Sequence, residues 1–122
     1  MAVETTGLDL SFEVAAADLS GNQYYAASVG ASGVALAGAN AQIDGVIQGQ
    51  PGAGDPVKLV YTGVTKAHAG AAIAKGALVA TDAAGKFVTA ASTNNAVGRA
   101  IEAAGADGDI FTLLLKTYGE AP

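Results

Sequence analysis

The side chains that could support catalysis in this chain are few and scattered. His68 is the single histidine and no cysteine is present, so neither a cluster of histidine metal ligands nor thiolate chemistry can be assembled. A catalytic triad needs only one histidine, but His68 lies in AHAGAAIAK without an Asp or Ser at a suggestive spacing. We therefore expect a solvent-exposed surface histidine and no catalytic residues.

The acidic side chains with the most suggestive spacing are Asp107 and Asp109 in ADGDI, and Asp55 in GAGDP. They could be fragments of a calcium loop, but a calcium ion needs about six or more oxygen ligands and the EF-hand spacing is missing. Aspartate beside glycine is typical of tight turns. We predict turn-forming carboxylates, no metal and no cofactor. A melting temperature lowered by EDTA would favour the calcium alternative.

Glycine and tyrosine groups give no clearer binding motif. Gly49, Gly52 and Gly54 do not follow the GxGxxG order and no helix is predicted after them, which argues against a phosphate-binding loop. Tyr24 and Tyr25 are adjacent on a predicted strand, so their rings point to opposite faces and cannot form one stacking platform. Packing in a core and at an interface is the better interpretation.

Composition restricts the class of protein. The chain has 122 residues, of which 51% are hydrophobic but only 6% aromatic, so a single domain with a core of small and branched side chains is expected. Only 14% of the residues are charged, a low value that favours oligomerisation. The net charge is −5 and the six basic residues are dispersed, which argues against a nucleic-acid partner.

Targeting signals are not apparent. The N-terminus, MAVETTGLDLSFE, lacks the basic and apolar regions of a secretory signal. No apolar run approaches the roughly 18 residues of a membrane-spanning helix. We expect a protein made in the cytoplasm that does not enter a membrane.

Hydrophobic periodicity predicts a mainly β fold, a small single-domain β-barrel or β-sandwich with short strands and glycine turns. Residues 8–14 alternate perfectly between apolar and polar, as in a half-buried strand. Only residues 67–75 have helical composition, and Gly70 interrupts them, so we expect at most one short helix. Residues 1–7 are expected to be a flexible N-terminal arm, residues 8–116 the β domain and residues 117–122 a tail. The other predicted strands are residues 23–29, 33–37, 42–48, 57–64, 77–81, 86–90, 97–103 and 110–116.

An internal repeat is visible when the chain is shifted by 54 positions (47 to 101). The shift aligns Ile47 with Ile101, Gly54 with Gly108, Asp55 with Asp109, Val57 with Phe111 and Leu59 with Leu113. Chance matches are common in sequences rich in glycine and alanine, so coincidence remains an alternative. A true duplication requires residues 42–60 and 96–114 to occupy equivalent topological positions.

The order and spacing of several short motifs resemble a known family over about residues 18–115. These motifs are DLSG at 18–21, GVI at 45–47, AGxxIxxG at 69–76, TDxxG at 81–85 and VGRAIE followed by DGD at 97–109. Together they are similar to the capsid cement (head decoration) proteins of tailed bacteriophages. Residues 117–122 follow no such pattern.

The resemblance implies a non-enzymatic protein on the outside of a virion. Such proteins bind the outer surface of an assembled capsid, commonly as homotrimers, and clamp neighbouring major capsid protein subunits. On this basis we expect the N-terminal arm to add a strand to a capsid sheet, with Leu8, Leu10 and Phe12 setting the register. Leu113 and Leu115 are candidates for an oligomer interface, although burial of that strand within one subunit is equally compatible.

Two other interpretations remain. AGxxIxxG followed by TDxxG also resembles small β-clip-like modules that accompany sugar-acid and carbohydrate-active enzymes, although such modules are usually fused to a catalytic domain. The chain could also be another structural subunit of the virion, such as a head fibre base or a tail component.

Overall fold

The computed structural model describes residues 8–92 and 94–120, and the side chains of residues 8–12 and 117–120 are outside that description. Within the described residues the chain forms nine strands and no helix, which confirms the predicted all-β class. The strands are β1 (Leu8–Val14), β2 (Ala26–Gly30), β3 (Gly33–Leu36), β4 (Gly45–Gln48), β5 (Pro56–His68), β6 (Leu78–Thr81), β7 (Phe87–Thr89), β8 (Asn95–Ala100) and β9 (Ile110–Glu120).

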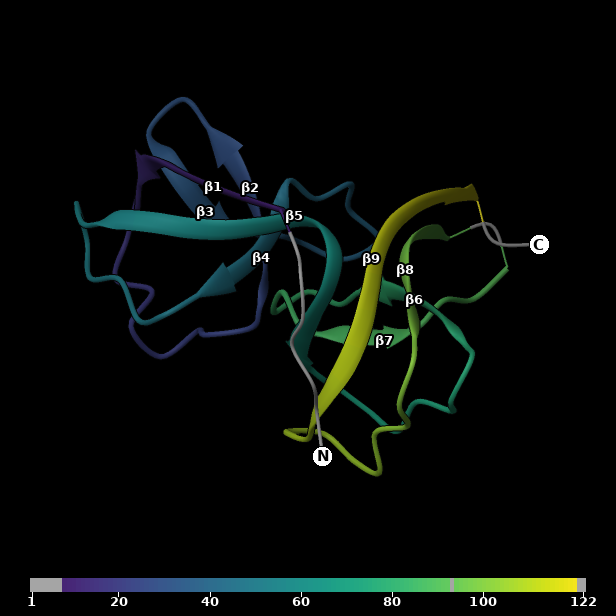
Figure 1. Cartoon of the computed structure of the whole chain (residues 1–122). Helices are drawn as coiled ribbons and strands as arrows, with labels where there is room; N and C mark the ends of the chain where they lie inside the picture. Colours follow the sequence, from purple (N-terminus) through teal and green to yellow (C-terminus); the bar gives the residue numbers. More distant parts are fainter. Residues whose placement is uncertain (1–7, 93, 121–122) are drawn as a thin grey trace.

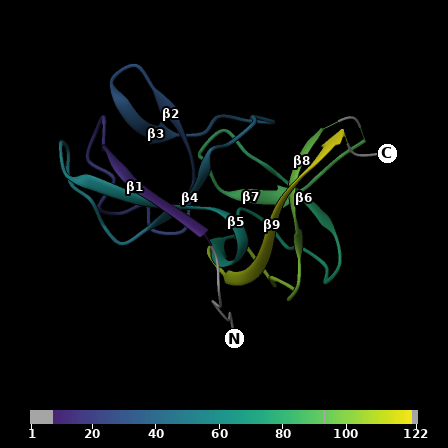
Figure 2. The ribbon, with the colours of Figure 1, turned by 45° about the horizontal axis from the view of Figure 1, so that its top comes forward.

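The strands form one curled antiparallel sheet that divides into two lobes, seen side by side in Figure 1 and from another direction in Figure 2. The sheet order is β3-β2-β4-β5-β9-β8-β6-β7, and β1 also pairs with β5. Lobe 1 comprises residues 8–62 and lobe 2 comprises residues 63–120. The long strand β5 belongs to both lobes.

The course of β5 from one lobe to the other depends on its pairing partners. Its first half pairs with β1 and β4, and its second half, from Gly63 onward, pairs with β9. Gly63 has a φ of 99°, a conformation that glycine adopts without the steric cost that a Cβ would impose. This glycine stands at the change of partners, where β5 bends from lobe 1 into lobe 2 (Figure 1).

The two lobes have the same strand pairing. In lobe 1, β2 pairs with β3 and β4, and β5 pairs with β1 and β4. In lobe 2, β6 pairs with β7 and β8, and β9 pairs with β5 and β8. Each lobe also has one parallel bridge at the corresponding place, between Ala15 and Val34 and between Ala69 and Phe87. Residues 42–60 and 96–114 therefore occupy equivalent topological positions, as the repeat predicts.

The register of strand pairing gives the number of positions that separates corresponding residues of the two lobes, and this number differs along the chain. Val14 opposite Pro56 corresponds to His68 opposite Ile110, a shift of 54 positions (14 to 68). The shift is 53 positions between β4 and β8 (45 to 98) and 52 between β2 and β6 (27 to 79). Ile47 therefore corresponds to Ala100 and not, as the uniform shift of 54 predicts, to Ile101.

The cores of the lobes follow the same correspondence. Among the side chains that the structure describes, seven form the core of lobe 1, and each counterpart lies in the core of lobe 2. The corresponding pairs are Ala15 with Ala69, Leu19 with Ile73, Ala27 with Val79, Val34 with Phe87, Ile47 with Ala100, Val57 with Phe111, and Leu59 with Leu113.

Residues 67–75 form no helix, which is compatible with the expected maximum of one short helix, because Ala67 and His68 continue β5 opposite β9 and Ala69 bridges to Phe87. Some predicted strand ends differ from the observed ones. Strand β9, predicted over residues 110–116, continues to Glu120, because its last residues pair with β8. Strand β2 begins at Ala26 and not at residue 23, because Tyr24 has a φ of 71° that interrupts an extended chain. The described residues include no helix long and apolar enough to span a membrane.

Candidate functional site

His68 packs against an aromatic ring and is only partly exposed, so the expected solvent-exposed surface histidine is in fact half-buried. The centroid of its imidazole lies 4.7 Å from that of the Tyr25 ring. Burial lowers the pKa of His68, and the positive charge of Lys86 lowers it further, while Asp107 and Asp82 oppose the shift. The Lys86 Nζ atom lies 3.0 Å from Asp107 Oδ1. The His68 imidazole therefore lies at the junction between the lobes, since Tyr25 belongs to lobe 1 and His68 to lobe 2.

Two of the three aspartates with calcium-like spacing, Asp55 and Asp109, close turns. Asp55 Oδ2 accepts a hydrogen bond from Gly52 N at 3.0 Å. Its counterpart in lobe 2, Asp109, accepts bonds from Gly105 N at 2.8 Å and Ala106 N at 3.1 Å. Among the described residues no group of three or more acidic, histidine or cysteine side chains has an arrangement that could hold a metal ion. Asp55 and Asp109 have the turn-forming role that the sequence predicts, whereas the Asp107 carboxylate forms an ion pair with Lys86.

Tyr24 and Tyr25 pack against different cores. Tyr24 lies against the core of lobe 2 and Tyr25 against the core of lobe 1. The two rings therefore do not form a common stacking surface, and their packing links the two lobes.

The junction between the lobes depends on two segments of lobe 1, residues 24–26 and 37–41, which we call the cover segments. They lie on a face of lobe 2 formed by His68, Thr81 and the turn between β6 and β7, which we call the covered face. The backbone bonds run from Ala26 N to Gly85 O at 2.7 Å, from Asn40 N to Thr81 O at 2.9 Å, and from His68 N to Tyr24 O at 3.0 Å.

Side chains add to this junction. The Thr81 hydroxyl donates to Gly38 O at 2.7 Å and accepts from Ala41 N at 3.0 Å. Asn95 N and Nδ2 donate to the side chain and backbone oxygens of Asn40. Sequence reasoning missed Thr81, Asn40 and Asn95, because isolated polar residues carry no periodic signal. The repeat is the signal that could have identified them, since it implies two units that must contact each other.

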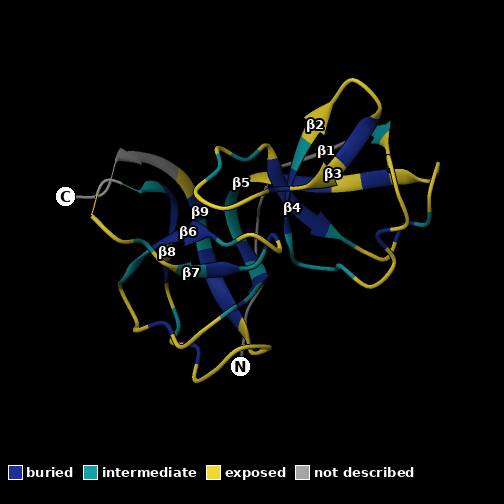
Figure 3. Cartoon of the chain, turned by 180° about the vertical axis from the view of Figure 1, so that it is seen from behind, coloured by how far each residue is buried: buried dark blue, intermediate teal, exposed yellow. Residues whose placement is uncertain are grey.

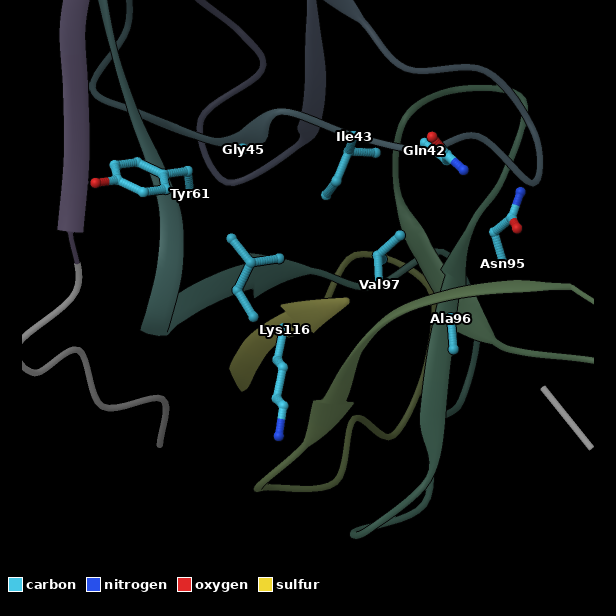
Figure 4. Close-up of a pocket in the computed structure, with 9 residues that line it drawn as sticks. Gln42, Ile43, Gly45, Tyr61, Asn95, Ala96, Val97 and Lys116 are labelled. Atoms are coloured by element: carbon cyan, nitrogen blue, oxygen red, sulfur yellow. The ribbon is translucent and has the colours of Figure 1, made fainter. Parts of the chain in front are cut away.

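A pocket of about 180 Å³ opens between the lobes (Figure 4). Its walls include corresponding positions of both lobes, Gln42 with Asn95 and Ile43 with Ala96, which the shift of 53 positions relates. Lys116 is the one charged group among the described lining residues. The described lining contains no carboxylate, histidine or cysteine side chain. Gly45, Tyr61, Val97 and Leu115 complete the lining.

The two leucines proposed for an oligomer interface lie inside the subunit. Leu113 is 0% exposed and Leu115 is 3% exposed, and both belong to the core of lobe 2. These two side chains are buried within one subunit, which is the alternative that the sequence left open. A contact between subunits through them would require the strand to open, so the proposals below use other residues.

The three residues proposed for capsid binding lie in β1. The backbone of Leu8, Leu10 and Phe12 belongs to a strand that pairs with β5 of the same chain, with Leu8 opposite Thr62 and Leu10 opposite Leu59. This part of the expected arm is therefore not an unpaired strand, because its partner is already within the subunit. The side chains of these residues, and the arm at residues 1–7, lie outside the described part.

Comparison with known proteins agrees with this architecture. Residues 4–116 match the family described as phage cement protein. A solved structure, the N base of the head fiber of bacteriophage phi29, is similar with a TM-score of 0.71 and 24% sequence identity. The alignment covers 89% of this chain and 95% of that chain, and at this identity it shows a shared fold. Curated protein sequences give no significant match. Since the family match extends over nearly the whole chain, this protein belongs to the phage cement protein family.

Proposed function

We propose that this protein is a non-enzymatic head decoration protein that binds the outer surface of an assembled phage capsid as a homotrimer. In this role it stabilises contacts between major capsid protein subunits after synthesis in the host cytoplasm. The observation that carries the proposal is the family match over residues 4–116. The architecture supports it, because the two equivalent lobes form one continuous sheet without an acidic, histidine or cysteine side chain among the described residues of the pocket between them.

The mechanism proposed for attachment is addition of a strand combined with multivalency. Residues 2–7 precede β1, whose register is fixed by pairing with β5. In the proposal these residues extend β1 and pair with the edge of a capsid sheet, where backbone hydrogen bonds provide affinity. Leu8, Leu10 and Phe12 then set the register of the extension through their position in β1. Three arms on one trimer convert weak individual contacts into strong binding.

The test is cosedimentation of the purified full chain with expanded, undecorated capsids and with immature shells. We expect binding to expanded capsids and not to immature shells, because a clamp across subunits fits only the expanded spacing. Bound protein should also raise the temperature at which the capsid disrupts. Equal binding to both particles, or to neither, would contradict the proposal.

A second candidate role is the base of a head fibre, which the fold of the phi29 protein favours. The two roles differ in what the attached protein carries. Electron microscopy of decorated heads would show compact knobs for a cement protein and projecting fibres for a fibre base.

A further inference from the structure

The covered face of lobe 2 is protected from water by lobe 1 of the same chain. Thr81 at its centre is 3% exposed. Ala26 and Ala37, from the cover segments, belong to the core cluster of lobe 2 although they lie in lobe 1. Val46 and Val60 of lobe 1 join the same cluster. Contact between lobes therefore buries apolar side chains as well as forming backbone hydrogen bonds.

The corresponding face of lobe 1, which we call the open face, has no such cover among the described residues. The register places Val14 at the position of His68 and Val29 at the position of Thr81. Val14 is 43% exposed and Val29 is 37% exposed. The turn that joins β2 and β3 borders this face and is largely exposed in Figure 3. Lobe 1 thus presents apolar side chains to water at the place where lobe 2 is covered.

Lobe 2 has segments that correspond by register to the cover segments of lobe 1. Within the described part of the chain, these segments of lobe 2 have no counterpart of the covered face to pack against. Leu78 and Ala90 correspond to Ala26 and Ala37, because Ala37 N donates to Ala26 O as Ala90 N donates to Leu78 O. Ala26 and Ala37 are buried, whereas Leu78 and Ala90 are partly exposed. Leu114, the counterpart of the buried Val60, is also partly exposed.

We propose that lobe 2 of one copy docks on the open face of lobe 1 of a second copy and repeats between chains the contact that joins the lobes within one chain. The two unused surfaces correspond by register to surfaces that already fit each other, and the turn between Val29 and Val34 is one residue shorter than the turn between Thr81 and Phe87. In this arrangement Leu78 lies against the β2–β3 turn of the next copy, as Ala26 lies against the β6–β7 turn within the chain.

The side chains at this contact favour association. The pair formed by Tyr25 and His68 within the chain is replaced by Ala77 and Val14 between chains, and Thr81 is replaced by Val29. At these three positions the contact between copies is more apolar than the contact within the chain, as expected for a stable interface between subunits, whereas the exposed Arg99 takes the position of Val46. The contact joins two different surfaces, so repetition of it generates a closed ring when the rotation permits. It supplies the subunit contact of the homotrimer in the proposed function.

Disulfide crosslinking tests the contact directly, because the wild-type chain contains no cysteine. The full chain carrying Val14→Cys and Ala77→Cys should form crosslinked multimers on mild oxidation, seen by non-reducing electrophoresis. The matched control is Tyr25→Cys with His68→Cys, which should close within one chain and leave the mass unchanged. If the first variant gives only monomers while the control variant forms its disulfide within the chain, the proposal is overturned.

Substitution of the open face provides an independent measurement. Val29→Lys should abolish the oligomer in sedimentation velocity, because the contact would bury a charge. Ile101→Lys alters a side chain of similar exposure, 39%, that lies outside both surfaces and should leave the oligomer intact. Equal oligomer populations in the two variants would also overturn the proposal.

The two proposals fail in distinguishable ways. If the wild-type chain binds expanded capsids but Val14→Cys with Ala77→Cys gives only monomers, the contact is refuted and the decoration role stands. If crosslinked multimers form but the wild-type chain binds no capsid, the contact stands and the decoration role is refuted.

Discussion

At the scale of single residues, glycines at corresponding positions of the two lobes mark places where neighbouring strands approach closely. A Cβ on Gly98 would lie 2.6 Å from Leu114 O and 2.7 Å from Leu113 Cδ1. Its counterpart Gly45 would place a Cβ 2.8 Å from Val60 O. Both distances are well below ordinary van der Waals contact. Both corresponding positions require a residue without a Cβ, so neighbouring strands pack in the same way in the two lobes.

Gly98→Ala should therefore destabilise the protein by about 1–3 kcal/mol, the usual cost of overpacking a tight site. Urea denaturation measures the change. Gly21→Ala is the matched control, because nothing lies within 4 Å of its added Cβ, and its effect should remain within about 0.5 kcal/mol. Similar stability of the two variants would show that the strands at Gly98 can separate without cost.

His68 should make the stability of the protein depend on pH. Its pKa in the folded state is below the ordinary value of 6.5, chiefly because of burial. The unfolded state therefore binds a proton more readily, so the stabilisation from neutral His68 is complete above pH 6.5 and declines as the pH falls below that value. His68→Gln removes this contribution.

The measurement is the free energy of unfolding of both proteins at pH 8 and pH 5. The advantage of the wild type over His68→Gln should be smaller at pH 5, and the titration of carboxylates cancels in the difference. An advantage that is the same at both values would show that His68 titrates alike in the folded and unfolded states.

At the scale of elements, β1 connects the fold to the proposed function. Its pairing with β5 from Leu8 onward fixes its direction and register within the subunit. Removal of residues 2–7 leaves all of β1 and its pairing in place. The proposed attachment to the capsid can therefore be separated from folding.

Deletion of residues 2–7 should abolish binding to expanded capsids while the melting temperature and the oligomeric state remain those of the full chain. Cosedimentation and thermal denaturation are the measurements. Deletion of residues 121–122 provides a control at the other terminus and should preserve binding. Retained capsid binding after the N-terminal deletion would refute the role of the arm.

At the scale of the whole molecule, the core of lobe 2 includes side chains from both lobes. Ala26, Ala37, Val46 and Val60 of lobe 1 belong to the core cluster of lobe 2, and β5 extends through both lobes. Separation of the lobes would expose these side chains and break the backbone bonds at the covered face. The repeat is therefore not a pair of independent domains.

Unfolding in urea should accordingly follow a single transition, with the same midpoint by far-ultraviolet circular dichroism and by tyrosine fluorescence. Tyrosine fluorescence responds to the junction of the lobes through Tyr24 and Tyr25, whereas circular dichroism reports all strands. Two separate midpoints would show that the lobes unfold independently.

The amino-acid sequence by itself determined the local features of this protein. Alternation at residues 8–14 identified β1 with its observed bounds, because the period of a strand is a property of adjacent residues. The shift of 54 positions revealed the repeat at Asp55 and Asp109, since both turns depend on contacts with residues nearby in sequence. Family motifs distributed along the chain identified the phage cement protein family.

The tertiary structure alone decided how distant segments meet. The extension of β5 to His68, the burial of Leu113 and Leu115, and the contact of His68 with Tyr25 all require partners far away in the chain. A sequence pattern shows that a side chain is apolar, but not whether its own core or another subunit covers it. That choice depends on how the two lobes close on each other, which leaves one face covered and its counterpart open.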